Sequence, residues 1–245
     1  MLINNFFKMI SRRILKLIFR NISLKRTIKY YNRSLTIFLS PDSQLKYLKK
    51  NFDEQFIKII ESNISKNKTI LDIGANCGVF GFMCLLKKSK KIYFFEPDLF
   101  LSNLIQRSID LNKLNNICTI IPLALYKKNQ FISFDISDNG RAANSISKFG
   151  GSQKGNIRNT NEIYAIKLDE LIDYINGDIF IKIDIEGAEQ EFIKGAKKFI
   201  KLNSPTILIE LSLKNKNKII SYFESLNYNY EEVFTKNYLF KINRN

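Results

Sequence analysis

Short apolar runs alternate with amphipathic segments along most of the chain after residue 40. Apolar runs of about four to eight residues are typical of buried strands, and apolar residues that recur every three or four positions are typical of helices. Regular alternation of the two predicts a mostly parallel, doubly wound α/β sheet with helices on both faces. The expected strands cover 69–73, 91–95, 117–123, 130–135, 162–168, 178–184, 205–211, 227–233 and 237–242, and the expected helices cover 41–65, 79–88, 98–112, 170–175, 188–201 and 214–226.

Two stretches depart from this alternation. The last two expected strands have no helix between them, which predicts an antiparallel strand at one edge of the sheet. Residues 136–161 are rich in serine, asparagine and glycine, so we expect a long loop there. A loop of this length inside a compact domain is usually functional or mobile. With Arg141, Asn144 and Ser145 on it, this one is expected to act as a lid over a binding site.

The first 40 residues differ in composition from the rest. They hold nine Lys or Arg residues and no Asp or Glu, so they account for +9 of the formal net charge of +16. On a helix, one sector of about 120° holds the apolar residues Phe6, Phe7, Ile10, Ile14, Leu17 and Ile18. The opposite side holds the cations Lys8, Arg12, Arg13, Lys16 and Arg20. We therefore divide the chain into a basic amphipathic arm, 1–40, and a folded domain, 41–245. The apolar stripe either docks on that domain or binds an anionic membrane surface through residues 1–20.

The composition excludes several classes of chemistry. The chain has no histidine, which excludes Ser-His-Asp and Cys-His nucleophilic catalysis and histidine metal ligands. Its three cysteines fit neither a disulfide framework nor a paired-cysteine zinc site. Charges interrupt every apolar run before the ~18 residues that a transmembrane helix needs. We expect a cytoplasmic protein, peripheral at the inner membrane surface if the arm binds lipid, whose acid–base chemistry uses Asp, Glu, Lys, Tyr or Cys.

A glycine turn between an apolar strand and a helix is the first candidate site. The turn follows Asp72 and contains Gly74, Asn76 and Gly78, and a second acid, Glu96, ends the next apolar strand. This order of elements is the one by which α/β sheets hold adenosine-containing cofactors. Asn76 stands where a dinucleotide fold has its second glycine, and Asp72 would repel a pyrophosphate but not a sulfonium. The pattern favours S-adenosylmethionine over NAD, with Glu96 on the ribose hydroxyls; an ordinary βα turn with a surface acid is the alternative.

A second group of charged residues ends a later strand. Lys182, Asp184 and Glu186 alternate with isoleucines, so they share one face of the strand. Ligands of α/β sheets bind at the carboxyl ends of the strands, and Glu210 near the end of the next strand faces the same cleft. We expect Asp184 to be the general base, with Glu186 or Glu210 as the alternative and Lys182 as an orienting group. An ion pair between Asp184 and Lys182 is the structural alternative. Carboxylates such as Asp184 and Glu210 suit Mg²⁺, but we predict no metal.

These residues resemble the FkbM-type methyltransferases, members of the class I, Rossmann-like group that uses S-adenosylmethionine. The resemblance implies a seven-stranded sheet with helices on both sides. It also implies that the cofactor residues are Asp72, Gly74, Ala75, Asn76, Gly78, Glu96, Pro97 and Ala124. The matching motifs, which lie between residues 50 and 212, are Leu71-Asp72-Ile73-Gly74-Ala75-Asn76-Cys77-Gly78, Glu96-Pro97, Leu168-Asp169-Glu170-Leu171-Ile172, Lys182-Ile183-Asp184-Ile185-Glu186-Gly187-Ala188-Glu189, Gly195-Ala196 and Ile209-Glu210-Leu211.

The same resemblance implies methyl transfer to an oxygen, commonly a hydroxyl of a sugar, a glycan or a small metabolite. Two alternatives from other classes remain. One is an RNA or DNA methyltransferase that uses the basic surface, and the other is a non-catalytic, membrane-associated protein built on a Rossmann-like core. The sequence contains no Asn-Pro-Pro-Tyr-type base-flipping loop and no paired catalytic cysteines. Nucleic acid is therefore not the expected partner.

Overall fold

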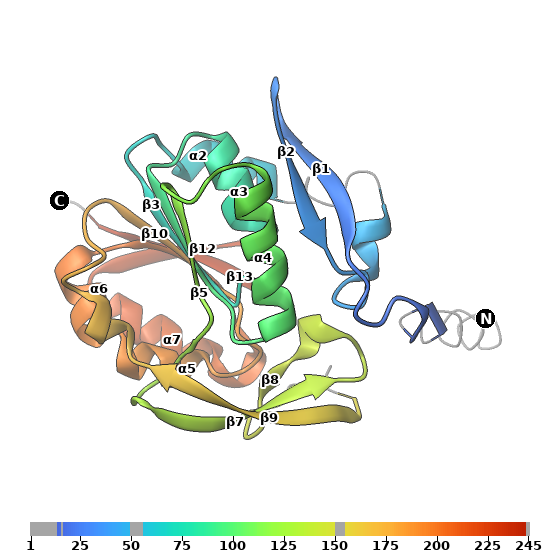
Figure 1. Cartoon of the computed structure of the whole chain (residues 1–245). Coiled ribbons are helices and arrows are strands. Elements are labelled where there is room, and N and C mark those ends of the chain that lie inside the picture. Colours follow the sequence, from blue (N-terminus) through green and yellow to red (C-terminus); the bar gives the residue numbers. More distant parts are fainter. Residues whose placement is uncertain (1–13, 16, 50–55, 150–154, 244–245) are drawn as a thin grey trace, which may run out of the picture.

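The computed structural model describes residues 14–15, 17–49, 56–149 and 155–243. Its centre is a seven-stranded sheet in the order β12-β13-β11-β10-β3-β4-β5, with α2, α3 and α4 on one face and α5, α6 and α7 on the other (Figure 1). The strands are β3 (Thr69–Ile73), β4 (Lys91–Phe95), β5 (Cys118–Ile121), β10 (Ile179–Ile183), β11 (Thr206–Glu210), β12 (Tyr228–Phe234) and β13 (Asn237–Ile242). The helices are α2 (Ile57–Asn63), α3 (Val79–Leu86), α4 (Leu99–Leu111), α5 (Glu189–Gly195), α6 (Lys197–Asn203) and α7 (Leu213–Glu224).

The direction of the strands confirms the expected fold class. Neighbouring strands from β11 to β5 pair in parallel, whereas β13 pairs antiparallel with both β11 and β12. The reversed strand is therefore inserted one position in from the edge, and β12 forms the edge itself. The tight turn between β12 and β13, in which Lys236 has a φ of +64°, leaves no length for a crossover helix.

Each face of the sheet has its own hydrophobic core. Ile70, Ile92 and Phe180 pack with α3 and α4 on one face. Leu71 and Ile181, which point the other way, pack with α5, α6 and α7. Because the strands are covered on both faces, they appear in the sequence as nearly continuous apolar runs, and the expected bounds of β3 and β4 agree with the structure.

Strands of a small second sheet occupy both ends of the region that we expected to be a loop at 136–161. This sheet has the order β6-β9-β7-β8, and β7 and β9 pair antiparallel over most of their length. The prediction of a loop was wrong for the ends of this region because β9 has polar side chains on both faces and lacks the alternation by which a strand is recognised. The strands are β6 (Ala124–Leu125), β7 (Gln130–Ser137), β8 (Ser145–Ile146) and β9 (Ile157–Ile166), with the short helix η3 (Arg141–Ala143) between β7 and β8.

The chain before residue 41 also belongs in part to the packed core. β1 (Leu24–Tyr30) and β2 (Arg33–Leu39) form an antiparallel hairpin that packs against α3 and α4. Ile28 and Ile37 on this hairpin are fully buried. The packed part of the chain therefore begins well before the boundary at residue 41. Most of the amphipathic helix expected within residues 1–20 lies outside the described residues.

The single helix expected over 41–65 is not what the structure shows. The described part of this stretch contains only a short 3-10 helix, η1 (Leu45–Leu48), and the later helix α2. Tyr47 of η1 and Ile59 and Ile60 of α2 are buried in the same hydrophobic core, so apolar residues at helical spacing here belong to two separate elements. Among the described residues, no helix has both the length and the apolar character needed to cross a membrane.

Candidate functional site

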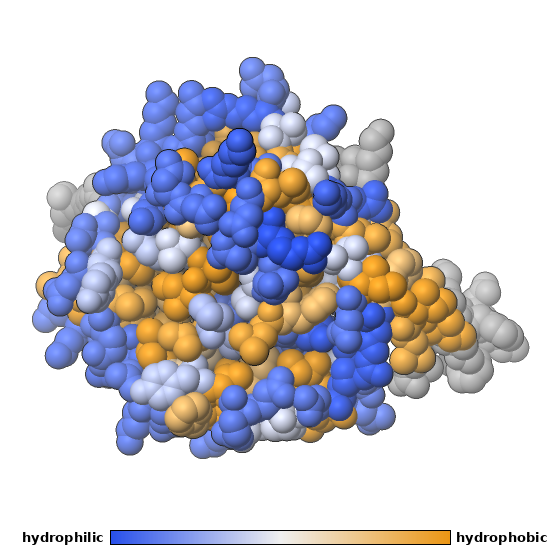
Figure 2. Space-filling view, viewed as in Figure 1, coloured by the Kyte–Doolittle hydropathy of each residue, from blue (hydrophilic) through white to orange (hydrophobic). Residues whose placement is uncertain are grey.

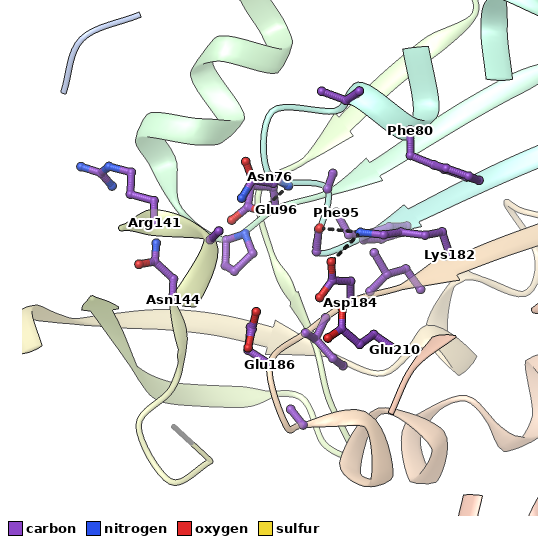
Figure 3. A pocket seen from close by; sticks show the side chains of 18 of the residues that line it. Asn76, Phe80, Phe95, Glu96, Arg141, Asn144, Lys182, Asp184, Glu186 and Glu210 are labelled. Carbon is purple, nitrogen blue, oxygen red and sulfur yellow. Dashed lines mark hydrogen bonds and ion pairs between the residues drawn. The ribbon is translucent and has the colours of Figure 1, made fainter. Parts of the chain in front are cut away.

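A cavity of about 390 Å³ lies where the carboxyl ends of the central strands meet the second sheet. Figure 3 shows Asn76 and Glu96 on one side of it, Lys182, Asp184 and Glu210 on another, and Arg141 and Asn144 at its rim. Its lining includes ten of the twelve residues predicted from the sequence: Gly74, Ala75, Asn76, Glu96, Pro97, Ala124, Lys182, Asp184, Glu186 and Glu210. The cavity therefore unites the glycine turn with the charged residues that begin at Lys182, more than a hundred positions later in the chain.

The glycine turn after β3 forms the floor of the cavity. Gly74 has a φ of +70° and Asn76 a φ of +58°, values that favour glycine and asparagine. The backbone N–H groups of Gly74 and Ala75 both donate to the carbonyl oxygen of Phe95, at 3.0 and 3.1 Å. A Cβ atom on Gly74 would lie 1.9 Å from the carbonyl oxygen of Asp184. This close approach brings the turn against the end of β10.

Glu96 is buried beside this turn, with 5% of its surface exposed. Its Oε2 accepts a hydrogen bond from the backbone N–H of Asn76 at 2.8 Å, and its Oε1 accepts one from the N–H of Asp98 at 2.9 Å. Burial, together with the nearby Asp98 carboxylate, raises the pKa of Glu96 to about 8. Once ionised, this carboxylate has about four lone-pair sites, so it keeps two for hydroxyl groups of a ligand.

The raised pKa of Glu96 predicts a pH dependence of stability. The folded chain keeps this proton up to about pH 8, whereas the ordinary pKa is 4.5, so the folded state binds more protons between these values. The free energy of unfolding is therefore expected to fall as the pH rises through this window, by up to ~1.4 kcal/mol per pH unit. Urea unfolding across this range should show a shallower fall for Glu96→Gln than for the wild type. Glu186, with a similar pKa, contributes equally to the pH dependence of the wild type and of the variant. If the free energy of unfolding fell equally steeply with pH in both proteins, the raised pKa would not belong to Glu96.

Asp72 and Gly78, the other two predicted residues, lie beneath the cavity and not on its lining. Asp72 is fully buried, and its Oδ2 accepts a hydrogen bond from the N–H of Gly81, in the first turn of α3, at 3.1 Å. Its Oδ1 lies 3.7 Å from Nζ of Lys182. Asp72 therefore accepts a hydrogen bond from one of the free N–H groups at the start of α3 and forms an ion pair with Lys182. Gly78, with a φ of +75°, packs against aromatic side chains of the core.

Lys182 connects the glycine turn to the carboxylates at the end of β10. Its Nζ donates to the carbonyl oxygen of Gly74 at 3.2 Å and lies 3.4 Å from Oδ2 of Asp184. Burial alone would lower the pKa of Lys182, but Asp184 and Asp72 raise it above the ordinary value. The ion pair between Asp184 and Lys182 is therefore present, and the side chain of Asp184 remains 35% exposed.

The other two acids of this cluster have raised pKa values. Burial raises the pKa of Glu186 to about 8, with further contributions from Asp184 and Glu210. Burial and the Asp184 carboxylate likewise raise the pKa of Glu210. Glu186 also has a φ of +50°, which is uncommon for a residue with a long side chain. Glu189, at the start of α5, is separate from the cluster, because its carboxylate accepts hydrogen bonds from the backbone N–H of Gly187 and from the side chain of Asn215 in α7.

One wall of the cavity comes from the segment around η1, which the sequence did not indicate. The hydroxyl of Ser43 donates to Oδ1 of Asn76 at 2.7 Å, and the hydroxyl of Tyr47 lies 3.5 Å from the same oxygen. Lys46 lines the cavity as well, and burial lowers its pKa. The apolar spacing of this stretch resembles a surface helix, so no local signal identified these residues.

A buried ionic network holds the segment after β7 over the cavity. Oδ2 and Oδ1 of the fully buried Asp42 accept hydrogen bonds from Arg158, at 2.8 and 2.9 Å, and Oδ2 accepts another from Arg141 at 3.2 Å. Arg141 and Asn144 also bind Asp98, which caps the start of α4. Burial would raise the pKa of Asp42, but the two guanidinium groups lower it below its ordinary value.

Replacing Asp42 with asparagine is expected to destabilise the fold. The substitution removes the charge that two guanidinium groups share, and hydrogen bonds to charged groups are worth about 1.5–3 kcal/mol each. Asp98 still binds Arg141, so we expect the free energy of unfolding to fall by about 2–3 kcal/mol. Asp138→Asn is the matched control, because that carboxylate is 48% exposed and lies 3.6 Å from Arg158. Equal effects of the two substitutions in urea unfolding would contradict a special role for Asp42.

The carboxylates of the cavity do not form a metal site in the part of the chain that the structure describes. No group of three or more histidine, cysteine, aspartate or glutamate side chains there is arranged to hold a metal ion.

Comparison with known proteins shows what the chain is similar to. It matches the model of the methyltransferase FkbM domain over residues 72–230. It is also similar to the structure of methyltransferase FkbM from Methylobacillus flagellatus KT, with a TM-score of 0.52 and 18% identity over 72% of this chain and 44% of that chain. No curated protein matches the sequence.

Two further solved structures have lower TM-scores. The putative methyltransferase yhhF from Escherichia coli has a TM-score of 0.47 and 12% identity, over 89% of this chain and 98% of that chain. TYW2 from M. jannaschii, in complex with AdoMet, has a TM-score of 0.45 and 15% identity, over 88% of this chain and 83% of that chain. The chain spans less than half the length of the FkbM structure it matches, but the family model covers more than half of the chain itself. The chain therefore belongs to the FkbM methyltransferase family.

Proposed function

We propose that the protein transfers the methyl group of S-adenosylmethionine to a hydroxyl oxygen of a sugar, a glycan or another small metabolite. The observation that supports this most directly is the convergence of Glu96 and the cluster of Lys182, Asp184 and Glu210 on one cavity. This reaction needs two such groups. One carboxylate binds the ribose hydroxyls of the cofactor, and the other takes the proton from the hydroxyl that is methylated.

The residues of the cavity fit S-adenosylmethionine. The cavity has a volume of about 390 Å³, which lies within the ~300–1,000 Å³ usual for small-molecule sites. Glu96 keeps lone pairs for two ribose hydroxyls, and the apolar side chains of Leu125, Phe134 and Ile146 provide a surface for the adenine ring. Asp184 favours the positive sulfonium and amino groups at the other end. When bound, S-adenosylmethionine supplies a methyl group on a sulfonium, which is an excellent leaving group.

Asp184 is best placed to take the proton of the acceptor. Its side chain is 35% exposed on the cavity, and Lys182 holds its Oδ2 at 3.4 Å. Glu186, with a pKa of about 8, keeps its proton at neutral pH and is a weaker candidate for the base. With S-adenosylmethionine bound to supply the methyl group and its sulfur as the leaving group, Asp184 would accept the proton of the acceptor hydroxyl. Orientation of the acceptor by such groups can contribute up to about 7–11 kcal/mol.

Calorimetric titration with S-adenosylmethionine, and in parallel with NADH, tests this function. We expect saturable binding of S-adenosylmethionine alone. In a titration at about pH 9, where Glu96 is ionised, Glu96→Gln should weaken it at least about tenfold, because each lost charge-assisted hydrogen bond is worth about 1.5–3 kcal/mol. Glu224→Gln, at an exposed position at the end of α7, is the matched control. Binding of NADH in place of S-adenosylmethionine, or binding that Glu96→Gln leaves unchanged, would overturn the proposal.

A further inference from the structure

The described part of the N-terminal segment exposes a cluster of large apolar side chains. Figure 2 shows apolar residues gathered at one extremity of the molecule, beside the residues drawn in grey. Leu17 is 64% exposed, Ile18 60% and Ile14 50%. Contiguous exposed apolar patches of this kind mark interaction sites. We call this cluster the apolar tip, and it consists of Ile14, Leu15, Leu17, Ile18 and Ile22.

Exposed cations continue from the apolar tip along the first strand. Arg20 lies between Ile18 and Ile22 of the tip, and its guanidinium group is 3.7 Å from the carboxylate of the half-exposed Asp138. Lys25 and Lys29 then lie on the exposed side of β1. We call Arg20, Lys25 and Lys29 the basic strip. The first 40 residues contain no Asp or Glu, so the charge of the strip is not neutralised within its own segment.

The apolar tip is anchored next to the cavity. The backbone turns at Asn21, which has a φ of +57°, and the Oδ1 of Asn21 accepts a hydrogen bond from Arg141 at 2.6 Å. Arg141 lines the cavity and belongs to the network of Asp42 and Asp98. Whatever binds the tip is therefore held beside the rim of the proposed active site.

We infer that the apolar tip and the basic strip bind the surface of an anionic lipid bilayer. Apolar side chains flanked by Lys and Arg are the features by which peripheral proteins insert between headgroups and attract acidic lipids. A second copy of this chain would bring together two like-charged surfaces, each on a chain of net charge +16. A nucleic acid would be attracted to the strip, but it offers no environment for five exposed apolar side chains.

Vesicle flotation with the full chain tests this inference without any cofactor or acceptor, so its outcome is independent of the proposed methyl transfer. We expect binding to vesicles of mixed phosphatidylglycerol and phosphatidylcholine, weak binding to phosphatidylcholine alone, and release by salt. The double substitution Leu17→Ser and Ile18→Ser should weaken binding at least about tenfold, because it removes apolar surface from the contact. Lys25→Gln with Lys29→Gln should weaken it by about tenfold or more.

Matched controls come from the opposite side of the molecule. Leu202→Ser with Leu213→Ser removes two leucines that are 70% and 86% exposed, and Lys198→Gln with Lys201→Gln removes two exposed cations of α6. Both controls should bind as the wild type does. No binding to anionic vesicles, or equal losses in the control variants, would overturn the inference. A dimer in light scattering that Leu17→Ser with Ile18→Ser dissociates would also overturn it, in favour of a second copy.

Discussion

Asp184→Asn is expected to slow methyl transfer by about 10²–10⁴-fold, the usual contribution of a general base. Asparagine preserves the shape of the side chain but cannot take a proton from the acceptor hydroxyl. Because Glu96 and the glycine turn are unchanged in this variant, the affinity for S-adenosylmethionine should change by less than about tenfold. The rate is measured as acceptor-dependent release of S-adenosylhomocysteine, with acceptors found by screening hydroxylated sugars and metabolites, and the affinity by calorimetry.

Two comparisons make the result for Asp184 specific. Asp173→Asn, at an exposed position outside the cavity, should retain the wild-type rate. Glu210→Gln should have a smaller effect than Asp184→Asn if Asp184 is the base and Glu210 only shapes the charge around it. Turnover by Asp184→Asn at the wild-type rate would show that this carboxylate does not take the proton. The opposite ranking of the two variants would transfer the role to Glu210.

Gly74→Ala is expected to lower the free energy of unfolding by about 2–6 kcal/mol. Two costs add at this position. An alanine with a φ of +70° is strained by about 1–3 kcal/mol, and its Cβ would lie 1.9 Å from the carbonyl oxygen of Asp184, which forces β10 and the turn apart. Urea unfolding followed by circular dichroism measures the change, and calorimetry should show that S-adenosylmethionine binding is lost with the geometry of the turn.

Gly177→Ala separates these two costs. Gly177 also has a positive φ, +102°, but a Cβ there would meet no atom within 4 Å. This variant should therefore show the backbone strain alone, and Gly74→Ala should be less stable than it by at least about 1 kcal/mol. If the two variants lose the same stability, the close approach between the glycine turn and β10 does not constrain the site as we describe.

Local patterns in the sequence were sufficient for the central sheet but not for its surroundings. β3, β4 and β10 are covered on both faces, so each is an apolar run that ends in a turn or an acid, and each was recognisable. β9 has polar side chains on both faces, which makes it resemble a loop. The hairpin of β1 and β2 was hidden by the basic residues on its exposed side, although its other side is buried against α3 and α4.

The candidate site divides in the same way. Glu96, Asp184 and Glu210 could be named from the sequence because acidic residues at the carboxyl ends of neighbouring strands converge on one edge of a sheet. The same reasoning placed Asp72 on the lining, whereas its carboxylate is used beneath the cavity by α3 and Lys182. An acid near the end of a strand can face either the edge or an adjacent helix, and only the packing shows which.

The sequence by itself determined the family, the parallel sheet and the acids at its carboxyl edge, because these depend on short motifs and on local apolar periodicity. Only the tertiary structure decided how the cavity is enclosed. Asp42 and Arg158 are 116 positions apart, and Ser43 meets Asn76 across 33 positions. No periodicity or motif links such pairs, since their contact depends on how the hairpin, the second sheet and the central sheet pack together.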